Sequence, residues 1–136
     1  MKELDIEAKL ENLDEVMAFV DEQLEEAECS MKAQMQIDLA VEEVFVNIAH
    51  YAYNPSVGGV TIRVVIEKDP LSVILTFIDE GKPYDPLAKE DPDVKLAAED
   101  RQIGGLGIFM VKKTMDNVEY EYSEGRNILT LKKGLE

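Results

Sequence analysis

The sequence has 136 residues, of which 29 are acidic and 14 basic, so the formal net charge is −15. This length predicts one domain, 1–136, large enough to bury a core. A surface this acidic repels phosphate backbones and anionic lipid, so direct binding to nucleic acid or to a membrane surface is not expected. Basic protein partners, or a cation at any site for an anion, are favoured instead. Taken alone, the acidity is equally well explained by solubility.

The number of cysteines and the length of the apolar runs further restrict the class of protein. Cys29 is the single cysteine, so neither a disulfide nor a thiolate metal site can form within this sequence. The first residues, MKELDIEAKLENLDEV, contain no signal-peptide core, and no apolar run approaches the length of a membrane span. We therefore expect a cytoplasmic protein.

The first part of the sequence predicts a strand and two helices. Apolar and polar residues alternate over 4–10, which is typical of a strand. Asn12, followed three residues later by Glu15, fits a helix N-cap, and that helix is expected to run to about residue 27. Ser30 can cap a second helix over 31–53.

The second helix carries polar side chains in an apolar setting. Apolar residues lie almost all the way round it, so most of the helix is expected to be buried. Glu43, Asn47 and His50 fall at i, i+4 and i+7, which places them on one stripe. A carboxylate and an amide on such a helix need partners, and this indicates a site. Taken alone, Glu43 and Asn47 could equally fill a polar gap in the core, and His50 is more often an ordinary histidine than a catalyst.

The second part of the sequence predicts a hairpin, a long irregular segment, a helix and two more strands. Residues 60–67 and 71–77 alternate and are joined by Lys68-Asp69-Pro70. The segment 82–103 has no clean period and contains three prolines, which is typical of a functional lid or of a disordered segment. The predicted fold is α+β, a two-layer sandwich in which helices pack on one face of a mixed or antiparallel sheet.

Three short stretches carry the residues expected to do chemistry. Asp79 continues the core face of its strand and is followed by Gly81, while Asn127 precedes the core face of the last strand. Exposed strand ends would be the simpler explanation for both polar residues. The run Gly104-Gly105-Leu106-Gly107 opens a helix, where bare backbone amides can approach a phosphate. A glycine hinge is the more frequent explanation of such a run taken alone.

The order of these motifs along the sequence indicates a family more specifically than any single motif does. E-x-x-x-N on a helix is followed by D-x-G after a strand, by a lid and by G-x-G at a helix start. This order resembles the GHKL superfamily of ATPases and kinases, over nearly the whole sequence. It looks closest to the bacterial anti-sigma factor serine kinases. The stretches that carry the resemblance are EEVFVNIAHYAY, IDEGKPYDP, IGGLGIFMVKKTMDNVEYEY and NILTLKK.

The resemblance implies a site for ATP or ADP with Mg²⁺. Glu43 corresponds to the catalytic base and Asn47 to the magnesium-binding asparagine. Asp79 corresponds to the aspartate that takes the adenine amino group, and Gly81 to the glycine under the base. The phosphates are assigned to the run 104–107 and the terminal phosphate also to Arg101. Asn127 stands where relatives carry a threonine that binds adenine through water, and Tyr51 stands where they often carry His or Lys.

The implied activity is phosphorylation of a serine on a STAS-type anti-anti-sigma protein, together with sequestration of a sigma factor. Two alternatives remain open, a nucleotide-gated binding module without kinase activity and a stand-alone histidine-kinase-type ATPase domain. The second is less favoured than a free-standing anti-sigma-type protein, because this sequence shows no dimerisation or phosphoacceptor helices of a sensor kinase. The resemblance also suggests a homodimer, for which the sheet end near Leu4 and Ile6 could serve.

Overall fold

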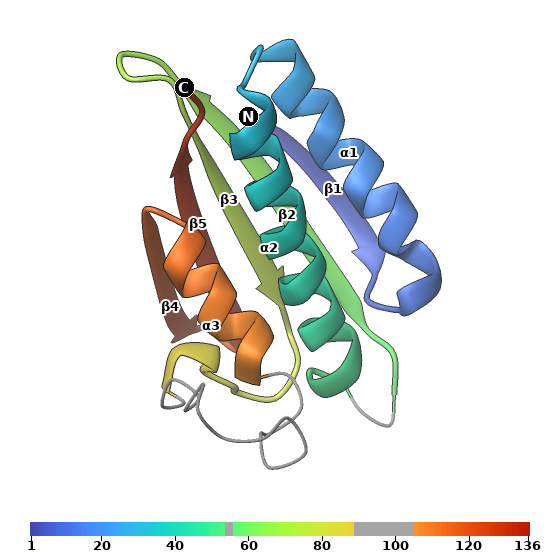
Figure 1. Cartoon of the computed structure of the whole chain (residues 1–136). Coiled ribbons are helices and arrows are strands. Elements are labelled where there is room, and N and C mark those ends of the chain that lie inside the picture. Colours follow the sequence, from blue (N-terminus) through green and yellow to red (C-terminus); the bar gives the residue numbers. More distant parts are fainter. Residues whose placement is uncertain (54–55, 89–104) are drawn as a thin grey trace.

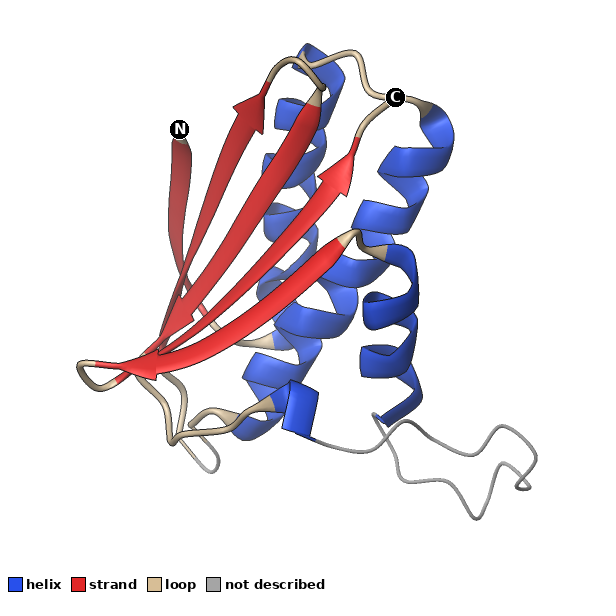
Figure 2. Cartoon of the chain, turned by 90° about the vertical axis from the view of Figure 1, so that its left-hand side faces the viewer, coloured by secondary structure: helices blue, strands red, loops and turns tan. Residues whose placement is uncertain are grey.

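The computed structural model describes residues 1–53, 56–88 and 105–136. In these residues a five-stranded sheet forms one layer, and three α-helices lie together on one face of that sheet (Figures 1 and 2). The α+β two-layer architecture predicted from the sequence is confirmed.

The sheet is antiparallel between all neighbouring strands of the described residues. Its spatial order is β1-β2-β3-β5-β4, so the last strand lies between β3 and β4. The predicted hairpin of β2 and β3 is present, with Val64 opposite Leu75. The strands are β1 (Lys2–Glu7), β2 (Gly59–Glu67), β3 (Ser72–Asp79), β4 (Asn117–Ser123) and β5 (Arg126–Gly134).

The helices cover the inner face of the sheet. α1 lies over β1 and β2, α2 crosses the middle, and α3 lies over β4 and β5 (Figure 1). None of the helices in the described residues is both long and apolar enough to cross a membrane. The helical segments are η1 (Leu10–Asn12), α1 (Leu13–Glu26), α2 (Met31–Tyr51), η2 (Pro86–Ala88) and α3 (Gly105–Thr114).

The core lies between these two layers. Alternate residues of the strands point inward and meet the apolar stripes of the helices, as period two in strands and 3.6 in helices require. Phe45 of α2 and Phe77 of β3 are the largest side chains that are almost fully buried there. Other buried members are Val16, Val20, Leu24, Ile37, Val41, Ile62, Leu75 and Leu131.

The two predicted helix caps have different outcomes. Ser30 caps α2 as expected, because its Oγ accepts a hydrogen bond from the Ala33 amide at 3.2 Å. The expected side-chain cap at Asn12 is wrong. The turn η1 precedes α1 and holds Asn12 at φ −96°, ψ 1° rather than in the extended conformation of a capping residue. Its Nδ2 instead donates to the carbonyl of Glu7 at 3.0 Å.

The expectation that most of α2 is buried is wrong for one side of the helix. Ile37, Val41 and Phe45 are buried, whereas Met35 and Leu39 are exposed. The reason is the layering, because a helix in the outer layer of a two-layer fold keeps one side in solvent. This leaves apolar side chains on the outer surface of α2.

Candidate functional site

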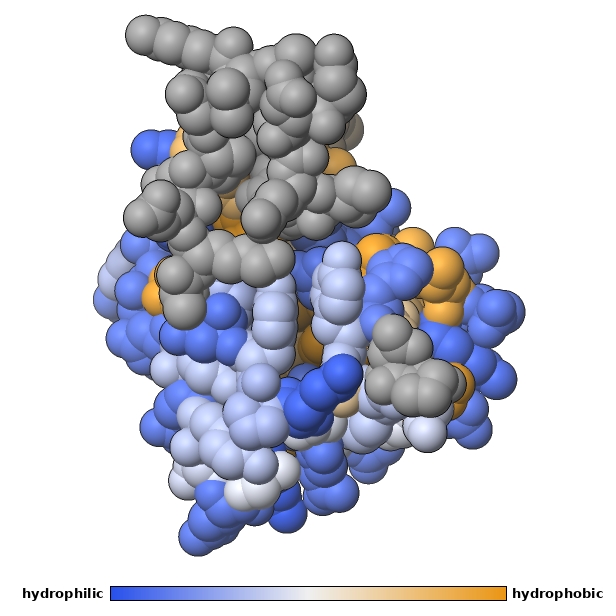
Figure 3. Space-filling view, turned by 90° about the horizontal axis from the view of Figure 1, so that it is seen from below, coloured by the Kyte–Doolittle hydropathy of each residue, from blue (hydrophilic) through white to orange (hydrophobic). Residues whose placement is uncertain are grey.

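A pocket lies where the second half of α2, the end of β3 and the start of β5 meet. Its space is about 460 Å³, including the part that is open to solvent. Figure 3 views the end of the molecule where β3 ends and shows apolar surface deep between hydrophilic side chains. The apolar walls are Val44, Ile48, Phe77, Ile108 and Leu129.

Asp79 is the buried carboxylate of this pocket. It is 5% exposed and closes β3 opposite Asn127 in the sheet register. Its Oδ1 accepts hydrogen bonds from the Gly81 amide and from Asn127 Nδ2, both at 2.9 Å. A buried carboxylate requires such donors. The exposed strand end that would be the simpler explanation is therefore wrong for Asp79, because tertiary contacts cover it.

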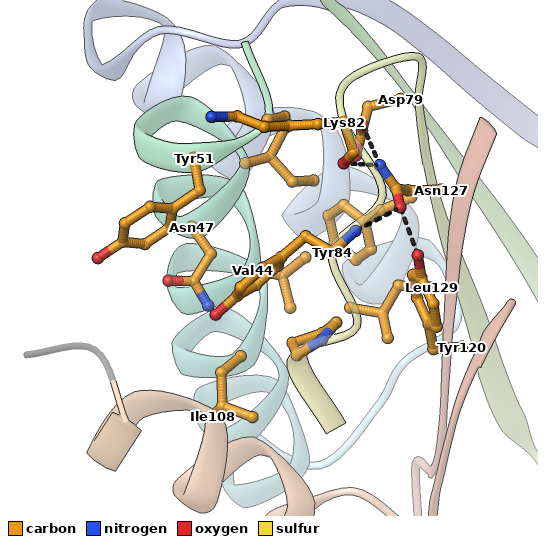
Figure 4. A pocket seen from close by; sticks show the side chains of 14 residues that line it. Val44, Asn47, Tyr51, Asp79, Lys82, Tyr84, Ile108, Tyr120, Asn127 and Leu129 are labelled. Atoms are coloured by element: carbon orange, nitrogen blue, oxygen red, sulfur yellow. Dashed lines mark hydrogen bonds between the residues drawn. The ribbon is translucent and has the colours of Figure 1, made fainter. Parts of the chain in front are cut away.

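Asn127 holds the pocket together from the neighbouring strand. Besides Asp79, its Nδ2 donates to the carbonyl of Lys82 at 2.9 Å. Its Oδ1 accepts from the backbone amide of Tyr84 at 3.2 Å and from the hydroxyl of Tyr120 (Figure 4). Both ends of the amide thus bind protein groups. Asn127 positions Asp79 and the segment after Gly81, a role that the sequence reasoning missed.

Tyr120 is a pocket residue that the sequence reasoning missed. It stands on β4 and lines the pocket beside Asn127. Burial raises the pKa of the Tyr120 phenol above its ordinary value, and the carboxylates of Asp85 and Asp79 add to the rise. The phenol therefore stays protonated and keeps donating to Asn127 at neutral pH. Only the sheet order, which brings β4 beside β5, reveals this contact.

Gly81 allows the chain after β3 to pass close to the end of α2. A Cβ on Gly81 would lie 2.6 Å from the Ala52 Cβ and would overlap the Ala52 carbonyl. This approach lets the Lys82 amide donate to the Ala52 carbonyl at 3.0 Å. Tyr53 secures the same junction, because its hydroxyl donates to the Gly59 carbonyl at 2.6 Å and accepts from the Glu80 amide at 2.7 Å.

Two tyrosines stack at the side of the pocket. The rings of Tyr51 and Tyr84 lie 5.8 Å apart between centroids, with an angle of 25° between their planes. Both side chains line the pocket (Figure 4). Tyr51 is the residue that departs from the resembled family. The structure gives it an aromatic partner from the segment after β3, which sequence spacing alone could not reveal.

Glu43 and Asn47 lie one turn apart on α2, on the side that faces α3. Asn47 lines the pocket, and its Nδ2 is buried without a hydrogen-bond partner among the described residues. Glu43 lies against the first turn of α3, because a Cβ on Gly107 would overlap its carboxylate. His50 is exposed and does not join them.

The glycine run is described only from Gly105, where α3 begins. Gly105 and Gly107 therefore belong to the first turn of this helix, whose free amides and dipole favour an anion. Leu106 follows Gly105 in the same turn. Arg101, Gly104 and the predicted lid from residue 89 onward lie outside the described residues.

The structure thus brings four predicted residues to one pocket or its border, namely Asn47, Asp79, Gly81 and Asn127. Glu43 and Gly107 meet just beyond it, in the seam between α2 and α3. An orphaned buried amide at Asn47 and a carboxylate with one oxygen fully bonded are features that a polar ligand would complete.

Comparison with known proteins agrees with this arrangement. The family model of the histidine kinase-like ATPase domain matches residues 6–133. The serine-protein kinase RsbW of Listeria monocytogenes is 31% identical over 108 residues, which cover 76% of this chain and 68% of that protein. The serine/threonine-protein kinase BtrW of Bordetella bronchiseptica is 28% identical over 102 residues, covering 75% and 71%.

A solved structure shows the same fold. It contains the RsbU and RsbW domains of a Mycobacterium tuberculosis protein and matches with a TM-score of 0.67 at 19% identity. The match covers 99% of this chain and 33% of that longer one. Since the family model covers nearly the whole sequence, the chain belongs to the histidine kinase-like ATPase domain family, the GHKL-type ATPases and kinases that include the RsbW anti-sigma factor serine kinases.

Proposed function

We propose that this chain binds ATP with Mg²⁺ and phosphorylates a serine of a STAS-type anti-anti-sigma protein. It would also hold a sigma factor inactive, as an anti-sigma factor. The observation that carries the proposal is the position of Glu43 and Asn47 on one helix, between a pocket with a buried aspartate and the first turn of α3. The family match and the relatives named serine-protein kinases support it.

Asp79 is assigned to the adenine amino group. Both of its described hydrogen bonds end on Oδ1, so Oδ2 is the oxygen assigned to the ligand. The apolar walls around it suit a flat base, and a carboxylate at this position selects an amino group over a carbonyl oxygen. GTP, which carries a carbonyl at the matching position, is expected to bind poorly.

Asn47 fits a magnesium site that the nucleotide completes. Mg²⁺ takes oxygen ligands and commonly combines one or two protein groups with waters and substrate phosphates. Within residues 1–53, 56–88 and 105–136, no three His, Cys, Asp or Glu side chains are grouped to hold a metal. The side-chain oxygen of Asn47 would therefore be one ligand among phosphates and waters. Because the protein is acidic, it would repel the phosphates, and the ion would neutralise part of their charge.

Glu43 is assigned as the general base. The carboxylate would accept the proton of the serine hydroxyl while the serine oxygen forms its bond to the γ-phosphorus and the bond from that phosphorus to the bridging oxygen of ADP breaks. The first turn of α3, next to Glu43, offers amides for the phosphate oxygens. The products are phosphoserine and ADP.

The test uses Mg-ATP, each STAS-domain protein of the source organism, and detection of phosphoserine by mass spectrometry. Glu43→Gln keeps the shape of the side chain but cannot take a proton, so transfer should fall by about 10²–10⁴ while nucleotide still binds. Asn47→Ala should instead weaken Mg-ATP binding. If wild type and Glu43→Gln transfer at the same negligible rate with every partner, the kinase proposal fails. A nucleotide-gated binding module then takes its place.

A further inference from the structure

The outer surface of α2 carries an apolar ridge where a surface helix normally has polar side chains. Met31, Met35 and Leu39 follow one another at four-residue spacing and are 80%, 62% and 59% exposed. The next residue at this spacing is Glu43. The ridge therefore extends about 18 Å along the helix, at 1.5 Å per residue, and ends at the proposed catalytic base.

A groove continues the ridge toward α3. Its lining includes Leu39, Glu43, Gly107 and Met110, and its space is about 840 Å³, including the part that is open to solvent. Met110 is itself 48% exposed. This groove shares none of its lining residues with the pocket that holds Asp79. Glu43 thus lines the groove, which suits an apolar segment, and stands one helical turn from Asn47 in the pocket that suits a nucleotide.

The side of the ridge that faces α1 carries negative charge, whereas Lys32 lies on the other side by helical spacing. Asp38 of α2 faces Asp21 and Glu25 of α1 on the side away from the groove. Glu42, which is exposed, lies within the ridge itself by helical spacing. An occupant that buries the methionines against this surface must therefore place basic side chains next to its apolar ones. Methionine-rich surfaces adapt readily to a partner segment.

We propose that the ridge and groove, defined by Met31, Met35, Leu39 and Met110, dock the protein substrate of the proposed kinase. The occupant is an amphipathic segment with Leu, Met or Phe on one face, Lys or Arg beside that face, and the acceptor serine at the end that reaches Glu43. This inference rests on the proposed function. It adds where the substrate binds and what chemistry its docking segment has.

The test separates docking from phosphoryl transfer. The probe is the purified STAS-domain protein of the phosphorylation experiment, titrated by calorimetry in the presence of Mg²⁺ and a non-hydrolysable ATP analogue. Met35→Glu and Leu39→Glu should weaken binding of this protein roughly tenfold or more, because they place charge in an apolar contact. ADP affinity should stay within twofold of wild type, since neither residue lines the nucleotide pocket. Glu42→Lys should also weaken binding, more strongly at low salt.

A matched control is Leu10→Glu. Leu10 is an exposed leucine like Leu39, with 48% exposure against 59%, but it lies in η1, away from the ridge. It should bind the STAS protein as wild type does. Equal affinity of wild type, Met35→Glu and Leu39→Glu overturns the docking proposal, as does a wild-type chain that does not bind the protein at all. A wild type that binds but transfers no phosphate overturns only the kinase proposal. A wild-type dimer that Leu39→Glu dissociates would assign the ridge to a second copy of this chain and overturn docking.

Discussion

Asp38 is expected to make the stability of this protein depend on pH near neutrality. It lies on α2 against Asp21 and Glu25 of α1, and its Oδ1 is buried without a hydrogen-bond partner among the described residues. Burial first, then the hydrogen bond and negative charge of Asp21, raise the pKa of Asp38 from 3.8 to about 7. The folded state therefore favours the protonated form of Asp38.

The direction in which stability changes with pH follows from this raised pKa of Asp38. The folded protein holds the proton of Asp38 more tightly than the unfolded chain does, so the stability from protonated Asp38 is fully present below about pH 4. It is lost as the pH rises to about 7. A shift of this size corresponds to about 4 kcal/mol in full, but Asp38 is only half-buried, and screening by solvent reduces the effect to about 1–2 kcal/mol.

The perturbation is Asp38→Asn, which keeps the shape and a donor toward Asp21 but cannot ionise. Urea unfolding followed by circular dichroism should give the variant and wild type similar free energies of unfolding at pH 4.5. At pH 8 the variant should be more stable by about 1–2 kcal/mol. Glu22→Gln, at an exposed position of α1, is the control and should show no such pH dependence. A difference between wild type and Asp38→Asn that is the same at both pH values would refute the reasoning.

Three further predictions concern the pocket and the neighbouring seam between α2 and α3. Asp79→Asn should lower ADP affinity about ten- to hundredfold, since a charge-assisted hydrogen bond is lost, and calorimetry showing unchanged affinity in a folded variant would contradict the assignment. Asn127→Ala removes the amide bound to Asp79 and Tyr84, so the free energy of unfolding should fall by about 1–3 kcal/mol, measured by urea titration. Gly107→Ala places a methyl group against Glu43, so phosphoryl transfer should fall while Leu10→Glu transfers normally.

Much of this architecture could be predicted because the patterns are local. Alternation along β3 placed Asp79 on the core face of its strand, and its burial confirms this position. Ser30 was recognisable as a cap because capping depends on a few neighbouring residues. The cap predicted at Asn12 is wrong because the turn η1 precedes α1 and changes the backbone conformation of Asn12. No residue spacing in the sequence indicated this turn.

The contacts of Asn127 and the ridge on α2 could not be predicted from spacing. Asn127 binds Tyr84 and Tyr120 only because β5 lies between β3 and β4, and strand order is a property of the whole sheet. For α2, an apolar residue at nearly every angle left open which side faces the sheet. The layering decided this, and so left Met35 and Leu39 in solvent.

The place of β5 inside the sheet has a consequence for how the protein acquires its pocket during folding. β5 pairs with β3 on one side and with β4 on the other, although it comes after both in the chain. A partly folded species without β5 lacks Asn127 and hence a bond to Asp79 and to the segment after Gly81. Nucleotide should therefore bind only the completed sheet and draw late intermediates toward it by mass action.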